Sequence, residues 1–166
     1  VVGDKKTSNG PCTADGKASI VDIDSMQYSY NGHKYIGTAH SPEYCHPDVH
    51  VDKAKLFDMP PKFDAFSLAV SFYMVLTGTH PYGNVINLPP YNKEKYQKLS
   101  SMIKARLYLR GEKGKYLKTI QECNLHANFA RLPLEMQQLF NQTFNNSLDN
   151  IPTVREWCEV LSKYSK

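Results

Sequence analysis

Two carboxylates at the end of an apolar stretch have the spacing to hold a metal ion together. Asp22 and Asp24 close the sequence Ile20-Val21-Asp22-Ile23-Asp24. Residues i and i+2 of a β-strand lie on the same face, so we expect both side chains on one side of a strand. Such a pair suits a hard cation such as Mg²⁺, which prefers oxygen ligands and often bridges to phosphates. The alternative is a turn at the strand end, in which one acid caps a backbone amide.

A second candidate metal site lies in the histidine-containing segment 40–50. His46 and His50 could share a helix face and, with Cys45, supply zinc ligands. The sequence has no fourth ligand at a familiar spacing, and Pro47 opposes a regular helix. We therefore prefer to interpret these residues as surface histidines of a loop.

Length and composition indicate one globular domain with a real core. The chain has 166 residues, of which 41% are hydrophobic and 22% charged. It contains no apolar run of about eighteen residues and no charged-then-apolar leader, so we expect neither a membrane span nor a signal peptide. The four cysteines form no Cys-x-x-Cys pair, which favours reduced thiols and a cytoplasmic protein.

The net charge of +4 is unevenly distributed along the chain. Between Lys93 and Lys118 there are nine Lys or Arg against Glu94 and Glu112, a local net charge of +7 that leaves −3 for the rest. This block could meet phosphate, an acidic protein or an anionic surface, or could form a solvated helix face. We do not expect nucleic acid as a partner, because few aromatic residues are interleaved with the charge and no recognition motif accompanies it.

The first part of the sequence is typical of short strands and turns. Met26-Gln27-Tyr28-Ser29-Tyr30 alternates apolar and polar residues and is followed by Asn31-Gly32 and then His33-Lys34-Tyr35-Ile36. Asn-Gly between β-prone arms predicts a hairpin, since both central turn residues need positive φ. Val1-Val2 and Ala18-Ser19-Ile20-Val21 are also β-like, and Asp15-Gly16 predicts a turn before the second of these.

The second part is helical. Residues 64–76 have no clean polar face, which is typical of a helix buried inside a domain, and Thr77-Gly78 and Pro81 should end it. Amphipathic helices are expected around Tyr96 to Leu107 and over 133–144.

A last helix should start at a capping box formed by Thr153 and Glu156, with Val154, Trp157 and Leu161 buried. The predicted fold class is therefore mainly α with small β-hairpins, built around a buried central helix. We expect a single domain over residues 1–166, β-rich in 1–50 and helical in 51–166.

Five short motifs, in this order, resemble the C-terminal (helical) lobe of a protein kinase. That family carries D-F-G, then G-T-x-E-Y-x-A-P-E, a D-x-W-S-L-G-V helix, L-T-G-x-x-P-F and R-P-T. The matching pieces are Asp22-Ile23-Asp24, Gly37-Thr38 with 42–48, residues 64–70, residues 76–82 and Pro152-Thr153. Asp24-Ser25-Met26-Gln27 is similar to bacterial serine/threonine protein kinase-like domains with D-S-x-Q and an aspartate in place of the D-F-G glycine.

The resemblance implies roles for the residues of the metal and substrate regions. Asp22 would be the metal-binding aspartate, and Asp24 would add a second oxygen ligand where the family has glycine. Thr38, beside Gly37, would face the substrate and the catalytic aspartate. Glu43 and Tyr44 would belong to the same substrate-facing activation segment.

Two further acids would be structural anchors. Asp48 occupies the position of the A-P-E glutamate, which in the family usually pairs with the arginine of R-P-T. In this sequence Ile151 occupies the position of that arginine, and we consider Arg155 as its substitute. Asp64 would tie the buried helix to the catalytic-loop backbone, or would be an ordinary helix N-cap. A rival register places Ser41-Pro42-Glu43 at A-P-E; we prefer His46-Pro47-Asp48, which aligns Glu43-Tyr44 with E-Y at the cost of an insertion after Thr38.

The sequence shows no Gly-rich loop, no V-A-I-K lysine and no H-R-D-x-x-x-x-N loop. Val1-Val2 is similar to the strand that follows that loop, so we expect the catalytic residues upstream, none in this chain, and no activity from it alone. The predicted function is the substrate-binding lobe of a serine/threonine protein kinase-like parent that transfers the γ-phosphate of ATP to protein hydroxyls. Mg²⁺ and ATP would bind only in that intact parent.

The expected partners are the missing N-lobe segment, a protein substrate and a second copy of the chain, because an uncovered lobe interface favours a homodimer. No membrane contact is expected. The first alternative is a pseudokinase or interaction scaffold without phosphotransfer, for which Asp24 and Ile151 argue. The second is an unrelated helical domain with a basic docking helix.

Overall fold

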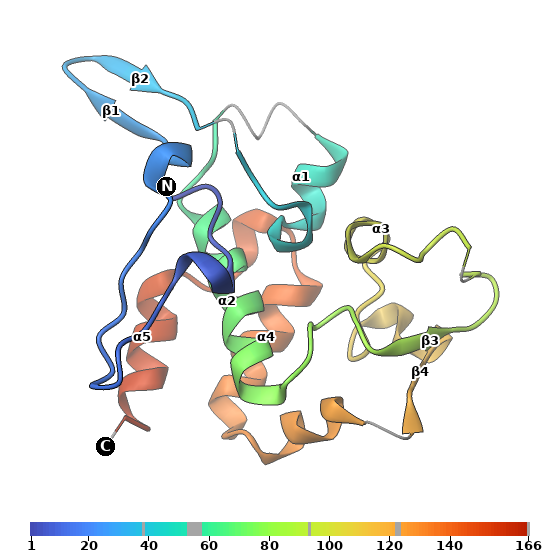
Figure 1. Ribbon diagram of the computed structural model, residues 1–166. Coiled ribbons are helices and arrows are strands. Elements are labelled where there is room, and N and C mark those ends of the chain that lie inside the picture. The colour runs from blue at the N-terminus through green and yellow to red at the C-terminus, as the bar shows by residue number, and fades with distance from the viewer. Residues whose placement is uncertain (38, 53–57, 93, 122–123, 166) are drawn as a thin grey trace.

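The computed structural model describes residues 1–37, 39–52, 58–92, 94–121 and 124–165, which fold around one central helix (Figure 1). The structure is mainly helical with two small antiparallel hairpins, as predicted. Its α-helices are α1 (Pro47–Val51), α2 (Lys62–Thr77), α3 (Leu99–Lys104), α4 (Leu134–Asn145) and α5 (Val154–Ser162). Its strands are β1 (Tyr28–Tyr30), β2 (His33–Tyr35), β3 (Val85–Asn87) and β4 (Leu117–Thr119). Within these described ranges, no helix has both the length and the apolar character needed to cross a bilayer.

Helix α2 is the centre of the fold. It contacts α4 and α5, and Phe66, Ala69 and Tyr73 along it are fully buried, which confirms the predicted buried helix. It ends where predicted, because Gly78 adopts a left-handed conformation (φ 85°) and its N–H donates to the Met74 carbonyl. Burial is not complete, however: Val75 is 77% exposed.

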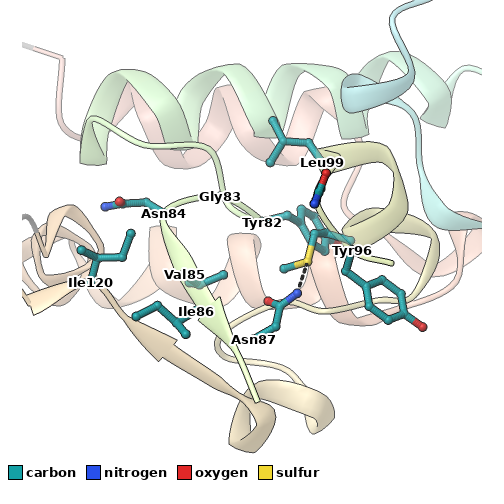
Figure 2. Close-up of a pocket in the computed structure, with 11 residues that line it drawn as sticks. Tyr82, Gly83, Asn84, Val85, Ile86, Asn87, Tyr96, Leu99 and Ile120 are labelled. Carbon is teal, nitrogen blue, oxygen red and sulfur yellow. Dashed lines mark hydrogen bonds between the residues drawn. The ribbon is translucent and has the colours of Figure 1, made fainter. Parts of the chain in front are cut away.

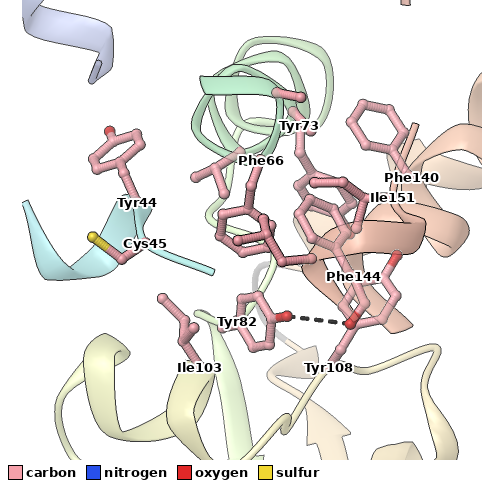
Figure 3. Close-up of a cluster of buried hydrophobic side chains, with 14 of the residues drawn as sticks. Tyr44, Cys45, Phe66, Tyr73, Tyr82, Ile103, Tyr108, Phe140, Phe144 and Ile151 are labelled. Carbon is pink, nitrogen blue, oxygen red and sulfur yellow. Dashed lines mark hydrogen bonds between the residues drawn. The ribbon is translucent and has the colours of Figure 1, made fainter. Parts of the chain in front are cut away.

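An aromatic cluster fills the space between α2, α4 and the chain that follows α2 (Figure 3). Tyr73 packs edge-on against Phe140 and Phe144, with ring centroids 5.3 and 5.8 Å apart. Tyr82 lies 5.9 Å from Phe144 and donates its hydroxyl to the carbonyl of that residue (3.4 Å). Perpendicular ring packing at these separations adds to the free energy gained by burying the rings, so this cluster is the main stabilising core.

The predicted C-terminal helices are confirmed with adjustments. Thr153 and Glu156 form the capping box at the start of α5, and Trp157 is fully buried. Val154, expected in the buried stripe, is 37% exposed. The helix expected up to Leu107 ends earlier: α3 stops at Lys104, since Arg106 takes a positive φ of 54° that breaks helical geometry.

The hairpin predicted around Asn31-Gly32 is confirmed. β1 and β2 pair antiparallel with Tyr28 opposite Tyr35, and both turn residues have positive φ (49° and 77°). The rings of Tyr28 and Tyr35 stack with centroids 4.8 Å apart. The hairpin projects from the body of the molecule beside the N-terminus (Figure 1).

The strands predicted before this hairpin do not form. The Ser19 and Val21 N–H groups donate to the Pro11 and Asn9 carbonyls, but this pairing gives only an isolated bridge between Cys12 and Ala18 and no regular strand. Ile20 and Val21 are exposed, so burial of their side chains does not stabilise a strand here. The turn at Gly16 (φ 82°) does form.

Candidate functional site

Asp64, in the first turn of α2, fixes the start of the chain. Its carboxylate oxygens accept hydrogen bonds from the backbone N–H groups of Val2 (2.8 Å) and Gly3 (3.3 Å). Two adjacent amides are thereby satisfied by one side chain more than sixty residues away. Asp64 therefore ties the central helix to the backbone directly before Asp4, whereas the resemblance implied a tie to a catalytic loop.

Ser25 holds the same loop from the other side. Its hydroxyl accepts from the Asp4 N–H (3.3 Å) and donates to the Val2 carbonyl (3.3 Å). A Cβ on Gly37 would lie 1.8 Å from the Ser25 carbonyl oxygen, and one on Gly3 would lie 2.5 Å from it. Only glycine can pack this closely, so Gly37 has a packing role at this point of the segment.

Asp4, Lys6, Asn9 and Asp22 converge in front of this loop. The Lys6 ammonium lies 2.8 Å from Asp4 Oδ2. The Asn9 side-chain amide donates to the Asp4 carbonyl (2.9 Å) and also lies 3.4 Å from one carboxylate oxygen of Asp4 and one of Asp22. Asn9 thus bridges two carboxylates that are 18 positions apart in the sequence.

Asp4 has the environment of a buried, ionised acceptor. The residue is only 7% exposed, and its Oδ1 atom is buried without a hydrogen-bond partner in the described chain. Burial alone would raise the pKa of this carboxyl, but Lys6 and the polar groups of Ser41 outweigh that effect and lower the pKa. Asp4 is therefore an ionised carboxylate whose Oδ1 is enclosed by the protein in this conformation, so a ligand reaches this oxygen only when the loop around it opens.

Asp22 and Asp24 do not form the strand-end pair that we expected. Asp22 has a left-handed backbone (φ 62°), and Ile23–Ser25 is a 3₁₀ turn, η2, rather than the end of a strand. Asp22 and Asp24 therefore do not lie on one face of a strand. Asp24 is exposed, with no hydrogen bond or ion pair to the residues described.

The donors near Asp22 still suit one kind of metal. No group of three His, Cys, Asp or Glu side chains able to hold an ion occurs in the described residues. Asp22 nevertheless offers an exposed carboxylate; Asn9 donates to it through Nδ2, and the Asn9 carbonyl oxygen accepts from the Ser8 hydroxyl (3.4 Å), so Asp22 is the oxygen ligand here. Mg²⁺ commonly takes one or two carboxylates and completes its shell with water and substrate phosphates, so this small donor set fits a phosphate-bound Mg²⁺ and not a metal held by protein alone.

Tyr44 braces the loop and does not face outward. Its side chain is buried, and its hydroxyl lies 3.2 Å from the Thr7 hydroxyl and 3.6 Å from the Met74 sulfur. The neighbouring Glu43 carbonyl accepts from the ring of His80 (3.0 Å). The segment expected to meet a substrate is thus packed against the core at this point. Thr38, the other residue expected there, lies outside the described residues.

Asp48 is an anchor, but its partner is not the one considered. Its Oδ1 lies 2.6 Å from the Arg106 guanidinium, and its Oδ2 accepts from the Leu148 N–H (2.9 Å). Burial raises the pKa of this carboxyl, but the Leu148 amide, His46 and Arg106 together lower it below its usual range. Arg155 is exposed and takes no part in this network. The unusual backbone of Arg106 turns its side chain towards α1, which sequence spacing did not reveal.

The histidine segment does not assemble a zinc site. His46 bonds through its ring nitrogens to the Asn146 carbonyl and the Asp48 N–H, both at 3.1 Å. His50 bonds to the Pro42 carbonyl (2.8 Å). Burial raises the pKa of the Cys45 thiol to about 12, so the thiolate that zinc requires is disfavoured.

Asp4, Lys6 and Asn9 were not predicted as site residues. The signal was present: Asp4 and Asn9 are five positions apart, the spacing of aspartate and asparagine in H-R-D-x-x-x-x-N. Val2 and Gly3 stand where that motif has histidine and arginine, and this difference hid the match. The chain matches no model of a known protein family and no curated protein.

Proposed function

We propose that the chain is the helical lobe of a serine/threonine protein kinase-like phosphotransferase and that it carries its own catalytic loop at residues 4–9. The intact parent would transfer the γ-phosphate of ATP to a protein hydroxyl. One observation carries the proposal: a buried Asp4 carboxylate with an unpaired oxygen is joined through Asn9 to Asp22. This differs from the expectation of a catalytic loop upstream of Val1.

Each polar residue of the site has a role in such a transfer. Asp4 Oδ1 accepts the proton of the substrate hydroxyl as its oxygen bonds to phosphorus and the bond to the ADP oxygen breaks. Lys6, which keeps Asp4 ionised, also stands where its charge can stabilise the transferred phosphoryl group. The Asp22 carboxylate would hold Mg²⁺, which when bound would neutralise the phosphate charge, and Asn9 would keep Asp4 and Asp22 in place by donating to both carboxylates.

The surrounding contacts support this assignment, because phosphoryl transfer depends mainly on positioning. Asp64 and Ser25 fix the backbone from Val2 to the Asp4 N–H. The ion pair of Asp48 with Arg106 fixes the end of the segment that follows β2. These three contacts join parts of the chain that are distant in sequence, and all of them converge on the loop or on the segment beside it.

The nucleotide-binding part must come from elsewhere. The sequence has neither a Gly-rich loop nor a V-A-I-K lysine, so the chain alone should not turn over ATP. Ile20, Ile23 and Val75 are each more than half exposed, and an uncovered apolar surface of this kind favours burial against an N-lobe or a second copy.

The test is phosphotransfer by the protein that joins this lobe to a nucleotide-binding lobe. We expect Asp4→Asn to lower kcat roughly a hundredfold or more with little change in KM for ATP, because only the proton acceptor is lost. Asp22→Asn should weaken activation by Mg²⁺. Asp15→Asn, a charge change in the exposed 13–17 turn, is the control. Unchanged kcat in the Asp4 variant would refute the assignment.

A scaffold without phosphotransfer is the second candidate. It is favoured by the small donor set at Asp22 and by the absence of the motif's histidine and arginine at Val2 and Gly3. Equilibrium binding of Mg-ATP separates the two. Binding that Asp22→Asn abolishes supports the enzyme, whereas no nucleotide binding supports the scaffold.

A further inference from the structure

A groove between β3 and α3 lies on the other side of the molecule from the tip of the β1–β2 hairpin (Figures 1 and 2). We name it the β3–α3 groove; its volume is about 310 Å³. Its walls are largely apolar and come from both elements and the chain beside them: Val85, Ile86, Tyr96, Leu99, Met102 and Ile120. The groove shares no lining residue with the Asp4 site, so its function is a separate question.

The edge of β3 that faces away from β4 is unpaired. β3 and β4 run antiparallel, and the Leu88 N–H donates to the Tyr116 carbonyl (2.8 Å) in the same register. Hydrogen-bonded and non-hydrogen-bonded pairs alternate along such a ladder, so the backbone N–H and C=O groups of Val85 and Asn87 point away from β4. In the described ranges no third strand joins this sheet. An open strand edge beside an apolar groove is the structure that binds an extended peptide by strand addition.

A polar side chain on the same strand is also weakly engaged. The Asn87 amide donates to the Met102 sulfur (3.3 Å), and a thioether is a poor acceptor. The Asn87 amide therefore loses little free energy when it leaves the Met102 sulfur and donates to a peptide carbonyl instead. Asn87 can therefore add a specific hydrogen bond to those of the strand edge.

The lysines around the groove indicate the charge of the segment that it would bind. Lys95 and Lys98 flank the lining residue Tyr96, and Lys118 stands directly opposite Ile86 across the β-ladder. All three lysines are exposed and form no ion pair with the residues described.

Three other basic residues of this block make structural contacts. Arg106 pairs with Asp48, and Arg110 donates to the Tyr73 hydroxyl (3.1 Å) and stacks on Phe129. Lys113 donates to a backbone carbonyl (2.7 Å). Lys104 and Lys115 are exposed, and Lys115 lies 5.2 Å from the centroid of the Tyr116 ring. Part of the positive charge predicted for 93–118 therefore serves the fold, and another part, Lys95, Lys98 and Lys118, borders the groove.

We propose that the β3–α3 groove binds an extended acidic segment of a partner protein. The segment adds to the open edge of β3, places apolar side chains in the groove, and directs carboxylates to Lys95, Lys98 and Lys118. An apolar floor favours a peptide over a nucleic acid, whose phosphates would leave that floor uncovered. The proposal does not depend on phosphotransfer, because binding is a property of the chain itself.

The experiment measures fluorescence polarisation of labelled nonapeptides that alternate glutamate with Leu, Ile, Val, Phe or Met. We expect saturable binding of at least one peptide by the 1–166 chain, weakened by added salt. The double variant Lys98→Glu/Lys118→Glu should weaken it about tenfold or more. Lys17→Glu, the same charge change in the 13–17 turn, should leave it unchanged.

A backbone variant tests strand addition separately. Val85→Pro removes a backbone N–H that points away from β4 and leaves the hydrogen bonds between β3 and β4 intact. Far-ultraviolet circular dichroism and a melting curve show whether this variant folds. Weaker binding at unchanged fold supports the proposal; if this variant does not fold, the lysine variants decide. Failure of every glutamate peptide to bind, or equal binding of the matching lysine peptides, overturns it. So does tighter binding of a single-stranded oligothymidylate, which would assign the lysines to nucleic acid.

Discussion

The two sides of α2 are held in different ways. Towards α4 and α5, the helix contacts close-packed aromatic rings, and most of the surrounding side chains are fully buried. Towards residues 1–27, the connection consists of polar contacts, chiefly those of Asp64 and Ser25 and the reciprocal bonds between Gln27 and Met59. The first region is stabilised by burial and the second by a few hydrogen bonds, so the two should differ in how easily they open.

The largest expected effect is in the aromatic region. Phe144→Ala removes a fully buried ring that contacts Tyr73, Tyr82 and Phe140, and should lower the free energy of unfolding by about 3–5 kcal/mol. Urea titration followed by circular dichroism measures this change. Val75→Ala, on the exposed face of α2, is the control and should change stability by less than about 1 kcal/mol. Equal effects of the two variants would contradict the comparison.

The sequence predicted what depends on local signals. The β1–β2 turn, the Gly78 stop and the Thr153 capping box each need only residues within a few positions of one another. It did not predict the β3–β4 sheet, whose three-residue strands are about thirty positions apart and are not joined by a short turn. The strand expected at 18–21 was wrong for another reason, since β-propensity was present but the side chains of Ile20 and Val21 stay exposed.

The candidate site likewise contains residues that the sequence predicted and residues that only the fold reveals. Asp64 was predicted from its place at the start of the buried helix, and Asp22 from the apolar residues around it. Asp4 and Asn9 were missed because their motif is incomplete, and their importance appears only where the fold brings them to Asp22. Arg106 was missed because a positive φ, which no local pattern announced, directs it to Asp48.

Acid should weaken the junction between the aromatic region and the turn at 42–44. His80 forms this junction: its Nδ1 accepts from the Tyr82 N–H, and its Nε2 donates to the Glu43 carbonyl. This ring must be neutral, and burial lowers its pKa from 6.5 to about 4. Between these two values the unfolded chain binds a proton that the folded chain does not, so stability should fall as the pH drops from 6.5 and level off below 4. The total loss is at most about 3 kcal/mol.

Chemical denaturation across this pH range measures the slope. His80→Asn keeps a donor and an acceptor but does not titrate. The slope of its free energy of unfolding against pH should therefore be smaller, by up to the amount that one bound proton contributes. The pKa of His126 is also lowered by burial, and that of His50 likewise, so the remaining slope in the variant should have the same sign. Identical slopes in the two proteins would show that His80 does not control the junction.

The smallest effect on global stability, and the most local one, should come from Asp64. Asp64→Ala leaves the Val2 and Gly3 amides without their acceptor and costs about 1–3 kcal/mol in the opening of this loop. Because the aromatic region is untouched, hydrogen exchange should speed up at Val2, Gly3 and Asp4 while amides in α4 exchange as before. Asp64→Asn retains one acceptor oxygen, so its exchange rates in the loop should lie between those of the unaltered protein and those of Asp64→Ala. If α4 accelerated together with the loop, the polar connection would be part of one cooperative unit with the core, and the distinction between the two regions would fail.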